Sequence, residues 1–160
     1  MKNLYLVRHA NAYPSIENDK ERILTPQGVK EVKAVAQKIL QKDFAIDIVI
    51  CSTATRTKQT LHHLESFLDK NFYIEYKDDL YNPKVEDFIS NIKNTPNHQN
   101  NLMIISHNPT TSEVANYILQ NKNVSFSTAT IVKLELNIDN WSELSEGCGT
   151  LKWVIKPDSL

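Results

Sequence analysis

Arg8 and His9 are adjacent residues whose side chains suit the chemistry of phosphoryl transfer. Arginine presents a planar, permanently charged fork of donors to a phosphate group. Histidine is a nucleophile when it is neutral, with one ring nitrogen free and the other held by a hydrogen bond. Only three of the 18 basic residues are arginines, namely Arg8, Arg22 and Arg56. Few positions in the chain can therefore offer such a fork.

Two later segments supply partners for this pair. Arg56 lies in the run CSTATRTKQT, and His107 lies in the run SHNP. Together, Arg8 and Arg56 would hold phosphate oxygens, disfavour a protonated His9 and stabilise the charge that develops during transfer. The chain has three glycines, too few for a P-loop or a dinucleotide fingerprint. Side chains and helix N-termini must therefore hold any phosphate.

Each of these residues also has an explanation without catalysis. His9 alone could be a hydrogen-bonded histidine at a strand end, and His107 could bond across the same rim. Arg56 could be an ordinary residue in the first turn of a helix, but a cation is unfavourable there unless an anion lies nearby. The combination of the four residues favours catalysis, and Ser52 is a candidate to orient one of their side chains.

The loop after His9 contains further candidates for substrate binding. Asn11 and Ser15 are within reach of a phosphate held by His9, so both are predicted as additional phosphate contacts. Arg22 is either a solvated charge of the loop or a secondary contact to the substrate.

Alternating patterns of strand and helix predict the elements that position these residues. Short apolar runs are typical of strands, and apolar residues spaced by three and four are typical of amphipathic helices. The predicted strands are residues 4–7, 46–51, 72–76 and 102–105, and the helical patterns are residues 29–40, 61–68, 85–92 and 114–119. Helix starts are predicted at Thr25-Pro26, Asn82-Pro83 and Asn108-Pro109.

This alternation predicts a three-layer α/β/α sandwich with a mostly parallel central sheet. The second and fourth predicted strands are apolar apart from Asp47, which indicates burial on both faces. Two further strands, residues 130–136 and 151–155, are expected to join the sheet, at least one of them antiparallel. Ligands of open α/β sheets bind beyond the carboxyl ends of the strands. Arg8, His9, Arg56 and His107 all follow strands, so they are predicted to meet at one rim.

Composition narrows the class of protein further. A chain of 160 residues fits a single domain, residues 1–160. Its formal charge of −1 gives no reason to expect a nucleic acid or a membrane as partner. Cys51 and Cys148 have no second ligand at a metal-binding spacing, so we interpret them as free thiols of a cytoplasmic protein. A monomer is compatible with the sequence, which does not itself determine the oligomeric state.

Four motifs in this order resemble those of the histidine phosphatase superfamily, which has the phosphoglycerate mutase-like fold. They are LVRHA at 6–10, LTPQG at 24–28, CSTATRTKQT at 51–60 and SHNP at 106–109. The short chain, the alanine after Arg-His and the run FSTATIVKLEL resemble the small SixA-type branch, the phosphohistidine phosphatases. The resemblance implies that His9 becomes phosphorylated, that Arg8, Arg56 and His107 bind the phosphoryl group, and that water then hydrolyses the phosphoenzyme without a metal or other cofactor.

The resemblance also bears on the substrate. Many superfamily members use an acidic residue after the third strand to protonate an alcohol leaving group, and here only Asp78 and Asp79 are weak candidates for that role. The SixA-type branch generally lacks this acid, which suits a phosphohistidine substrate carried by a phosphotransfer domain or a phosphocarrier protein. Two alternatives are a small phosphoester hydrolase acting on a sugar phosphate or nucleotide, and a non-catalytic phosphate-binding module.

Overall fold

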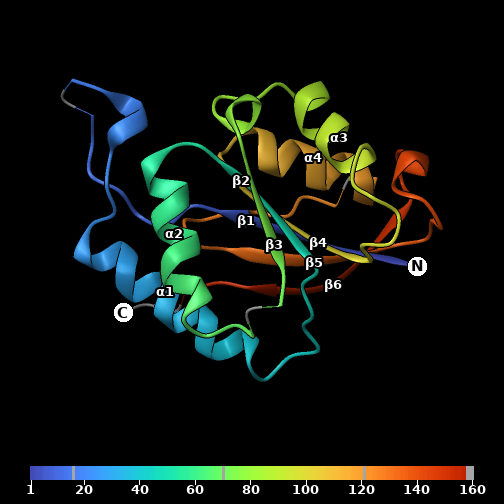
Figure 1. The fold of residues 1–160 in the computed structure, drawn as a ribbon, viewed down its shortest axis with the longest axis horizontal. Coiled ribbons are helices and arrows are strands. Elements are labelled where there is room, and N and C mark those ends of the chain that lie inside the picture. Colours follow the sequence, from blue (N-terminus) through green and yellow to red (C-terminus); the bar gives the residue numbers. More distant parts are fainter. Residues whose placement is uncertain (16, 70, 121, 158–160) are drawn as a thin grey trace.

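The structure, a computed structural model, describes residues 1–15, 17–69, 71–120 and 122–157, which form an α/β fold around one sheet (Figure 1). The strands of the described residues are β1 (Lys2–Arg8), β2 (Ile48–Ser52), β3 (Tyr73–Lys77), β4 (Asn101–Ser106), β5 (Ile131–Leu136) and β6 (Gly149–Ile155). The α-helices are α1 (Pro26–Ile39), α2 (Thr55–Glu65), α3 (Val85–Lys93) and α4 (Thr110–Leu119). Short 3-10 helices are η1 (Asp19–Glu21), η2 (Asp78–Leu80) and η3 (Trp141–Glu143).

The six strands lie in the order β3-β2-β4-β1-β5-β6. β1, β2, β3 and β4 are mutually parallel. β5 runs antiparallel to β1, and β6 runs antiparallel to β5. The predicted mostly parallel sheet with an antiparallel C-terminal strand is therefore confirmed.

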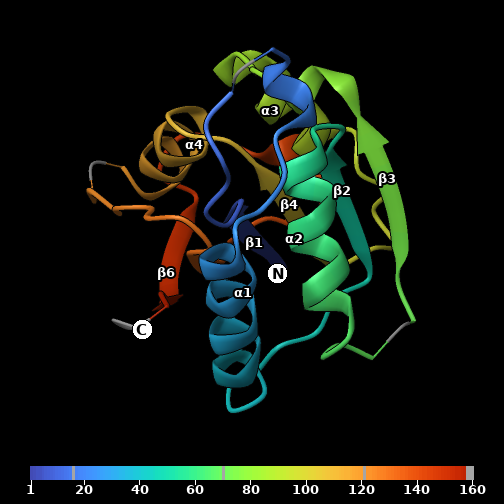
Figure 2. The same ribbon diagram turned by 90° about the vertical axis from the view of Figure 1, so that its left-hand side faces the viewer.

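Helices cover both faces of this sheet, and the pleat of β1 shows why. Tyr5 and Val7 point to the core under α1 and α2, whereas Leu4 and Leu6 point to the core under α3 and α4. Figure 2 shows α1 and α2 beside the sheet, with α3 and α4 at its other side. Every residue of β2 is buried, as the apolar run over residues 48–51 predicts. The three-layer prediction is confirmed.

Two of the three predicted helix starts are displaced. Thr25 caps α1 as predicted, because its side chain accepts a hydrogen bond from Gly28 N. α3 begins at Val85 rather than after Asn82, which has a φ of 52° and makes a turn instead of a cap. α4 begins at Thr110, with Pro109 at the capping position. Asn108 nevertheless serves its first turn, since Asn108 Oδ1 accepts from Ser112 N at 3.3 Å.

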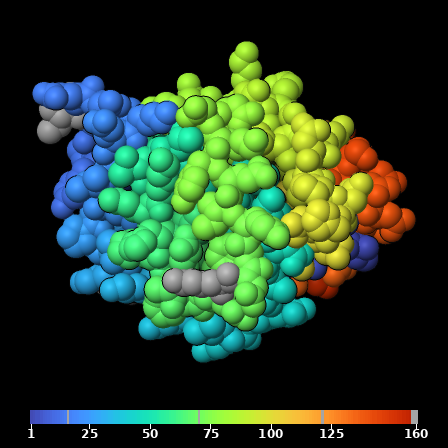
Figure 3. Space-filling model, in the orientation of Figure 1, coloured from blue at the N-terminus to red at the C-terminus, as the bar shows by residue number. Residues whose placement is uncertain are grey.

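The connection between β1 and α1 is a long loop, and it carries residues of the candidate site. It contains η1 and projects from the body of the molecule at the upper left of Figures 1 and 3. None of the helices in the described ranges has both the length and the apolar character needed to cross a membrane.

Candidate active site

The register of the parallel strands aligns the ends of β1, β2 and β4. Arg8 lies opposite Ser106 on β4, and Cys51 lies opposite Ile105. The residues that follow these positions therefore emerge at one rim, as the sequence predicts. The rings of His9 and His107 have centroids 5.3 Å apart.

His9 is held in the form that a nucleophile requires. Its Nδ1 lies 2.8 Å from the carbonyl oxygen of Ala10. A carbonyl can only accept, so Nδ1 carries the hydrogen and Nε2 keeps its lone pair. Burial lowers the pKa of His9 to about 4, and the charges of Arg56 and Arg8 act in the same direction. His9 is therefore neutral at pH 7.

Ser52, at the end of β2, orients His107. Its Oγ lies 2.8 Å from His107 Nε2 and accepts a hydrogen bond from Ala54 N at 3.2 Å. Burial lowers the pKa of His107 to about 3, with His9 and Arg56 as further causes. Since the neutral ring has one N–H, a donation from the Ser52 hydroxyl to Nε2 leaves that hydrogen on Nδ1.

Three buried polar atoms at this rim have no hydrogen-bond partner, and all three suit an anion. They are Arg8 Nε, Arg56 Nε and His107 Nδ1. Elsewhere in the described ranges, Trp153 Nε1 is the only other buried side-chain nitrogen or oxygen without a partner. A buried donor that is left unpaired costs about 1–3 kcal/mol. The concentration of such donors beside His9 is what a site built for phosphate oxygens requires.

The two arginines use their remaining donors to hold the loops that surround the rim. Arg8 Nη1 donates to the carbonyl oxygen of Phe126 at 2.8 Å. Arg56 Nη1 donates to the carbonyl oxygen of Asp19 at 2.8 Å, and its Nη2 lies 3.2 Å from Asp19 Oδ2. A cation in the first turn of a helix is unfavourable unless an anion lies nearby. For Arg56 in α2, the Asp19 carboxylate is such an anion.

Asp19 belongs to η1 and connects three parts of the site. Tyr81 OH donates to Asp19 Oδ2 at 2.6 Å, and Arg22 Nη1 lies 3.2 Å from Asp19 Oδ1. The hydrogen bond from Tyr81 holds the pKa of the Asp19 carboxyl below its usual range, and the charge of Arg56 lowers it further. Asp19 is therefore a carboxylate at pH 7.

A cavity of about 320 Å³ opens beside these groups. This volume lies near the lower end of ligand pockets, roughly 300–1,000 Å³, and fits a small group rather than a large cofactor. Its lining consists of polar and ring-bearing residues from four segments of the chain: Asp19, Arg56, Tyr81, Asn82, Pro83, His107, Asn108, Pro109 and Thr110.

The substrate-binding candidates in the loop after His9 do not line this cavity. Asn11 Oδ1 accepts from Thr25 Oγ1 at 2.7 Å, so Asn11 anchors the start of α1. Ser15 is exposed and lines a separate surface hollow with Arg22. The described contacts thus assign neither Asn11 nor Ser15 to a phosphate. Arg22 is partly exposed and pairs with Asp19, and its charge contributes to the lowered pKa of both His9 and His107.

The two weak candidates for a proton donor are engaged outside the cavity. Asp78 accepts from Thr53 Oγ1 at 2.6 Å and pairs with Lys20 at 3.1 Å. These bonds hold the pKa of Asp78 below its usual range. Asp79 accepts from Asn91 Nδ2 at 3.1 Å. Neither carboxyl lines the cavity.

Asp19 and Tyr81 are the residues at this site that the sequence analysis did not identify. Both lie in segments where apolar residues do not recur with the spacing of a strand or a helix. No sequence pattern therefore predicts where their side chains point. The one available signal for Asp19 is its spacing of three residues from Arg22. Within the described residues, no group of three or more His, Cys, Asp or Glu side chains is arranged to hold a metal ion.

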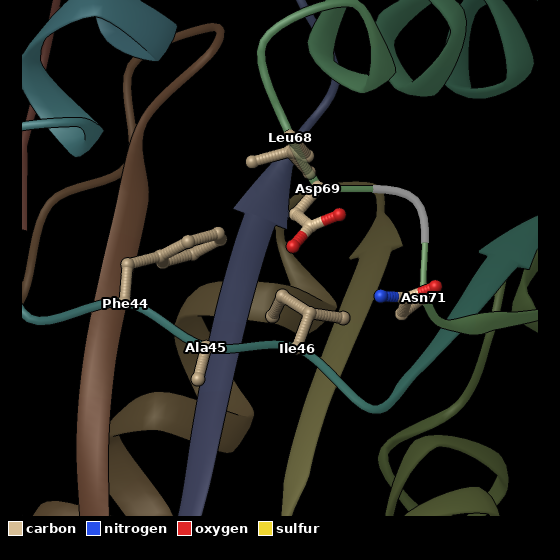
Figure 4. Close-up of a pocket in the computed structure, with 6 residues that line it drawn as sticks. All are labelled: Phe44, Ala45, Ile46, Leu68, Asp69 and Asn71. Atoms are coloured by element: carbon tan, nitrogen blue, oxygen red, sulfur yellow. The ribbon is translucent and has the colours of Figure 1, made fainter.

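A second hollow, of about 220 Å³, lies at the opposite end of the sheet. Figure 4 shows Phe44, Ala45 and Ile46 on the segment before β2, facing Leu68, Asp69 and Asn71 on the segment before β3. These segments precede the strands, whereas ligands of such sheets bind where the strands end. The hollow also lacks the paired cations and histidines found at the carboxyl rim.

Sequence comparison relates the chain to known proteins. The sequence profile of the histidine phosphatase superfamily (branch 1) matches residues 4–82, which include Arg8, His9 and Arg56. An uncharacterized protein of Mycobacterium tuberculosis (strain H37Rv) is 30% identical over 156 residues, covering 91% of this chain and 96% of that protein.

Structure comparison finds similar folds among solved structures, including two proteins named SixA. A protein assigned as the phosphohistidine phosphatase SixA of Nakamurella multipartitia matches with a TM-score of 0.87 and 25% identity, over 99% of this chain and 97% of that one. The protein histidine phosphatase SixA complexed with tungstate matches with a TM-score of 0.83 and 23% identity, over 97% of each chain.

Proposed function

The chain belongs to the histidine phosphatase superfamily, and on this premise we propose that it is a metal-independent phosphatase that removes the phosphoryl group from phosphohistidine in a protein. The observation that carries the proposal is the set of three unpartnered buried donors beside His9. The names of the two SixA proteins among its structural neighbours, one a protein histidine phosphatase and one assigned as a phosphohistidine phosphatase, support the choice of substrate.

The reaction proceeds in two displacements at phosphorus. His9 Nε2 donates its lone pair to phosphorus while the bond to the leaving group breaks, which gives a phospho-His9 intermediate. Water then attacks this phosphorus, and the P–N bond to His9 breaks to release phosphate. Arg8, Arg56 and His107 donate to the phosphoryl oxygens in both steps, where charge spreads over those oxygens.

The carboxyl groups near the site favour a nitrogen leaving group over an alcohol. An alkoxide needs a proton from a general acid as it departs. Asp78 and Asp79 are engaged elsewhere, and Asp19 is ionised. An imidazole ring that already carries a proton departs as a neutral molecule and needs no such acid.

A comparison of substrates tests this choice. The protein is assayed with a phosphotransfer domain phosphorylated on histidine and, in parallel, with a panel of sugar phosphates and nucleotides. We expect the phosphohistidine domain to have the larger kcat/KM. Faster hydrolysis of esters, with the phosphohistidine domain inert, would replace the proposal by the small phosphoester hydrolase.

Trapping of the intermediate tests the nucleophile. After incubation with labelled substrate and rapid denaturation, the protein should retain phosphate in a form that is labile in acid and stable in base. His9→Ala should retain none, whereas His62→Ala, which removes an exposed histidine on α2, should retain as much as wild type. Equal turnover by wild type and His9→Ala would contradict the assignment of His9 and favour a phosphate-binding module.

A further inference from the structure

Asp19 is a charged group of the cavity with no role in the two displacements described above. It lines the cavity together with Tyr81 and His107. Its carboxylate is fixed by donors from three separate segments, since Arg22 belongs to its own loop, Arg56 to α2 and Tyr81 to the segment after η2. A side chain held this firmly at the wall of a pocket is suited to recognition.

The carboxylate retains capacity for one more hydrogen bond. A carboxylate offers about four acceptor positions, two on each oxygen. Asp19 Oδ2 receives Arg56 and Tyr81, whereas Oδ1 receives one donor, Arg22, among the described residues. One position on Oδ1 is therefore open to a ligand that carries an N–H.

The groups that surround this carboxylate keep it ionised. The charged or titratable side chains that face it are Arg22, Arg56, Tyr81 and His107, with Lys20 over the Tyr81 ring at 5.6 Å. None of them brings a second carboxylate to the cavity. Asp19 can thus accept a hydrogen bond at neutral pH, but it cannot donate a proton.

The Tyr81 ring gives the cavity an aromatic wall beside this acceptor. It meets the His107 ring edge to face, with centroids 5.8 Å apart. Rings favour such edge-to-face or offset contacts. A leaving group that enters the cavity therefore meets an aromatic side chain and an anionic acceptor in the same lining.

We propose that Asp19 selects the leaving group: its carboxylate accepts a hydrogen bond from the N–H of the imidazole ring of phosphohistidine. This inference rests on the proposed function. Asp19 thereby favours substrates whose leaving nitrogen belongs to a protonated ring and gives no help to an alkoxide.

The bonds and charges balance without a proton transfer in this step. Bound phosphohistidine carries the phosphoryl group on one ring nitrogen and a hydrogen on the other. As the bond from His9 Nε2 to phosphorus forms, the P–N bond of the substrate breaks and its electron pair stays on the departing nitrogen. This pair cancels the positive charge of the ring, so neutral imidazole leaves with its hydrogen still bonded to Asp19.

The test uses two substrates that differ in what their leaving groups need. One is the phosphotransfer domain phosphorylated on histidine, and the other is p-nitrophenyl phosphate, whose phenolate departs without a proton. We expect Asp19→Asn to lower kcat/KM for phosphohistidine by about ten- to hundredfold, because a hydrogen bond to a charged partner is lost. For p-nitrophenyl phosphate the loss should be at least about threefold smaller, because Arg56 Nη1 keeps its hydrogen bond to the carbonyl oxygen of residue 19.

A pH profile separates this role from a merely structural one. The carboxylate keeps the bound ring protonated at higher pH, so the alkaline limb of kcat for phosphohistidine should lie about one pH unit lower in Asp19→Asn. Glu21→Gln is the matched control, because it removes the same charge from an exposed residue of the same η1 turn. It should leave both substrates and the alkaline limb unchanged.

Three outcomes decide the matter. Selective loss of phosphohistidine turnover with a shifted limb supports the role of Asp19. Equal losses for both substrates would show that Asp19 only positions Arg56, and would overturn the inference while the proposed function stands. A wild-type protein that hydrolyses p-nitrophenyl phosphate but not phosphohistidine would overturn the proposed function together with the inference.

Discussion

At the scale of single residues, the proposed chemistry depends on two histidines that are kept neutral by burial. His9 is 8% exposed and His107 is 6% exposed. Burial disfavours the imidazolium form more than the adjacent arginines do, since burial is the largest cause of both lowered pKa values. As the proposed nucleophile, His9 should therefore be active at any pH above its pKa.

This places the acid limb of activity far below the usual range of histidine. The folded pKa of about 4 lies below the ordinary 6.5, so the active neutral form is lost only as the pH falls through about 4. The expected kcat/KM for p-nitrophenyl phosphate, corrected for the titration of the substrate, is level from pH 7 to about 5 and then declines. A limb centred near 6.5 would contradict a buried, neutral His9.

Ser52 should matter because it sets which nitrogen of His107 carries the hydrogen. Without the Ser52 hydroxyl, His107 Nε2 loses its partner and Nδ1 is free to present a lone pair to the phosphate. We expect Ser52→Ala to lower kcat/KM roughly tenfold, as loss of one oriented donor implies. Ser66→Ala, at an exposed residue after α2, is the control. Unchanged kinetics in Ser52→Ala, with normal folding, would rule out this orienting role.

The sequence predicts the residues that follow strands and misses those that lie in loops. His9 and His107 each directly follow a strand, and the sequence shows these strands as apolar runs. Asp19 and Tyr81 are placed by hydrogen bonds between loops. Such contacts depend on the whole fold, so no local pattern of apolar residues predicts them. Asn11, close to His9 in sequence, also anchors the start of α1, and its predicted contact with phosphate stays a prediction.

At the scale of elements, the start of α1 fixes the loop that begins at His9. A Cβ atom at Gly28 would lie 2.1 Å from the carbonyl oxygen of Asn11. The backbone of α1 therefore touches the backbone just two residues after His9. The same carbonyl accepts from Thr25 N at 3.1 Å, so the contact has little room to relax.

Gly28→Ala should therefore damage both folding and activity. We expect a loss of about 1–3 kcal/mol in the free energy of unfolding, the usual cost of forcing an atom into a packed contact. Urea unfolding measures this loss, and the kcat of the folded variant should fall because Asn11 and the His9 loop must shift. Gln27→Ala, the exposed neighbouring position, should change neither quantity. A fully stable and active Gly28→Ala would mean that the loop yields freely.

Helix starts show where local sequence rules stop applying. The Thr25-Pro26 start is correct because threonine caps α1 within its own loop. Asn82-Pro83 is displaced because Asn82 takes a left-handed conformation, and Pro83 instead offers its carbonyl to Thr110 of α4 at 2.8 Å. A contact with α4 is thus made where the Asn-Pro pair predicts a helix start. Pro83 and Thr110, which form this contact, both line the cavity.

At the scale of the whole molecule, the sheet order makes the site a product of distant segments. Alternation of strands and helices predicts the layers, but it does not predict that β4 lies between β2 and β1. That order depends on pairing between strands that are far apart in the sequence. It places His107, which follows β4, between His9 and Arg56. The three unpartnered donors then come from β1, α2 and the end of β4.

Binding of an oxyanion should therefore stabilise the whole fold, since it joins segments that the sheet alone brings together. Tungstate at about 100 times its Kd would add about 2.7 kcal/mol to the free energy of unfolding. For a chain of this size, that corresponds to a rise of roughly 5–10 °C in Tm. The rise should persist in Asp78→Asn, whose carboxyl lies outside the cavity. It should shrink in Arg56→Lys, because lysine keeps the charge but loses the fork. Equal rises in wild type and Arg56→Lys, measured by thermal unfolding with and without tungstate, would show that the anion binds elsewhere.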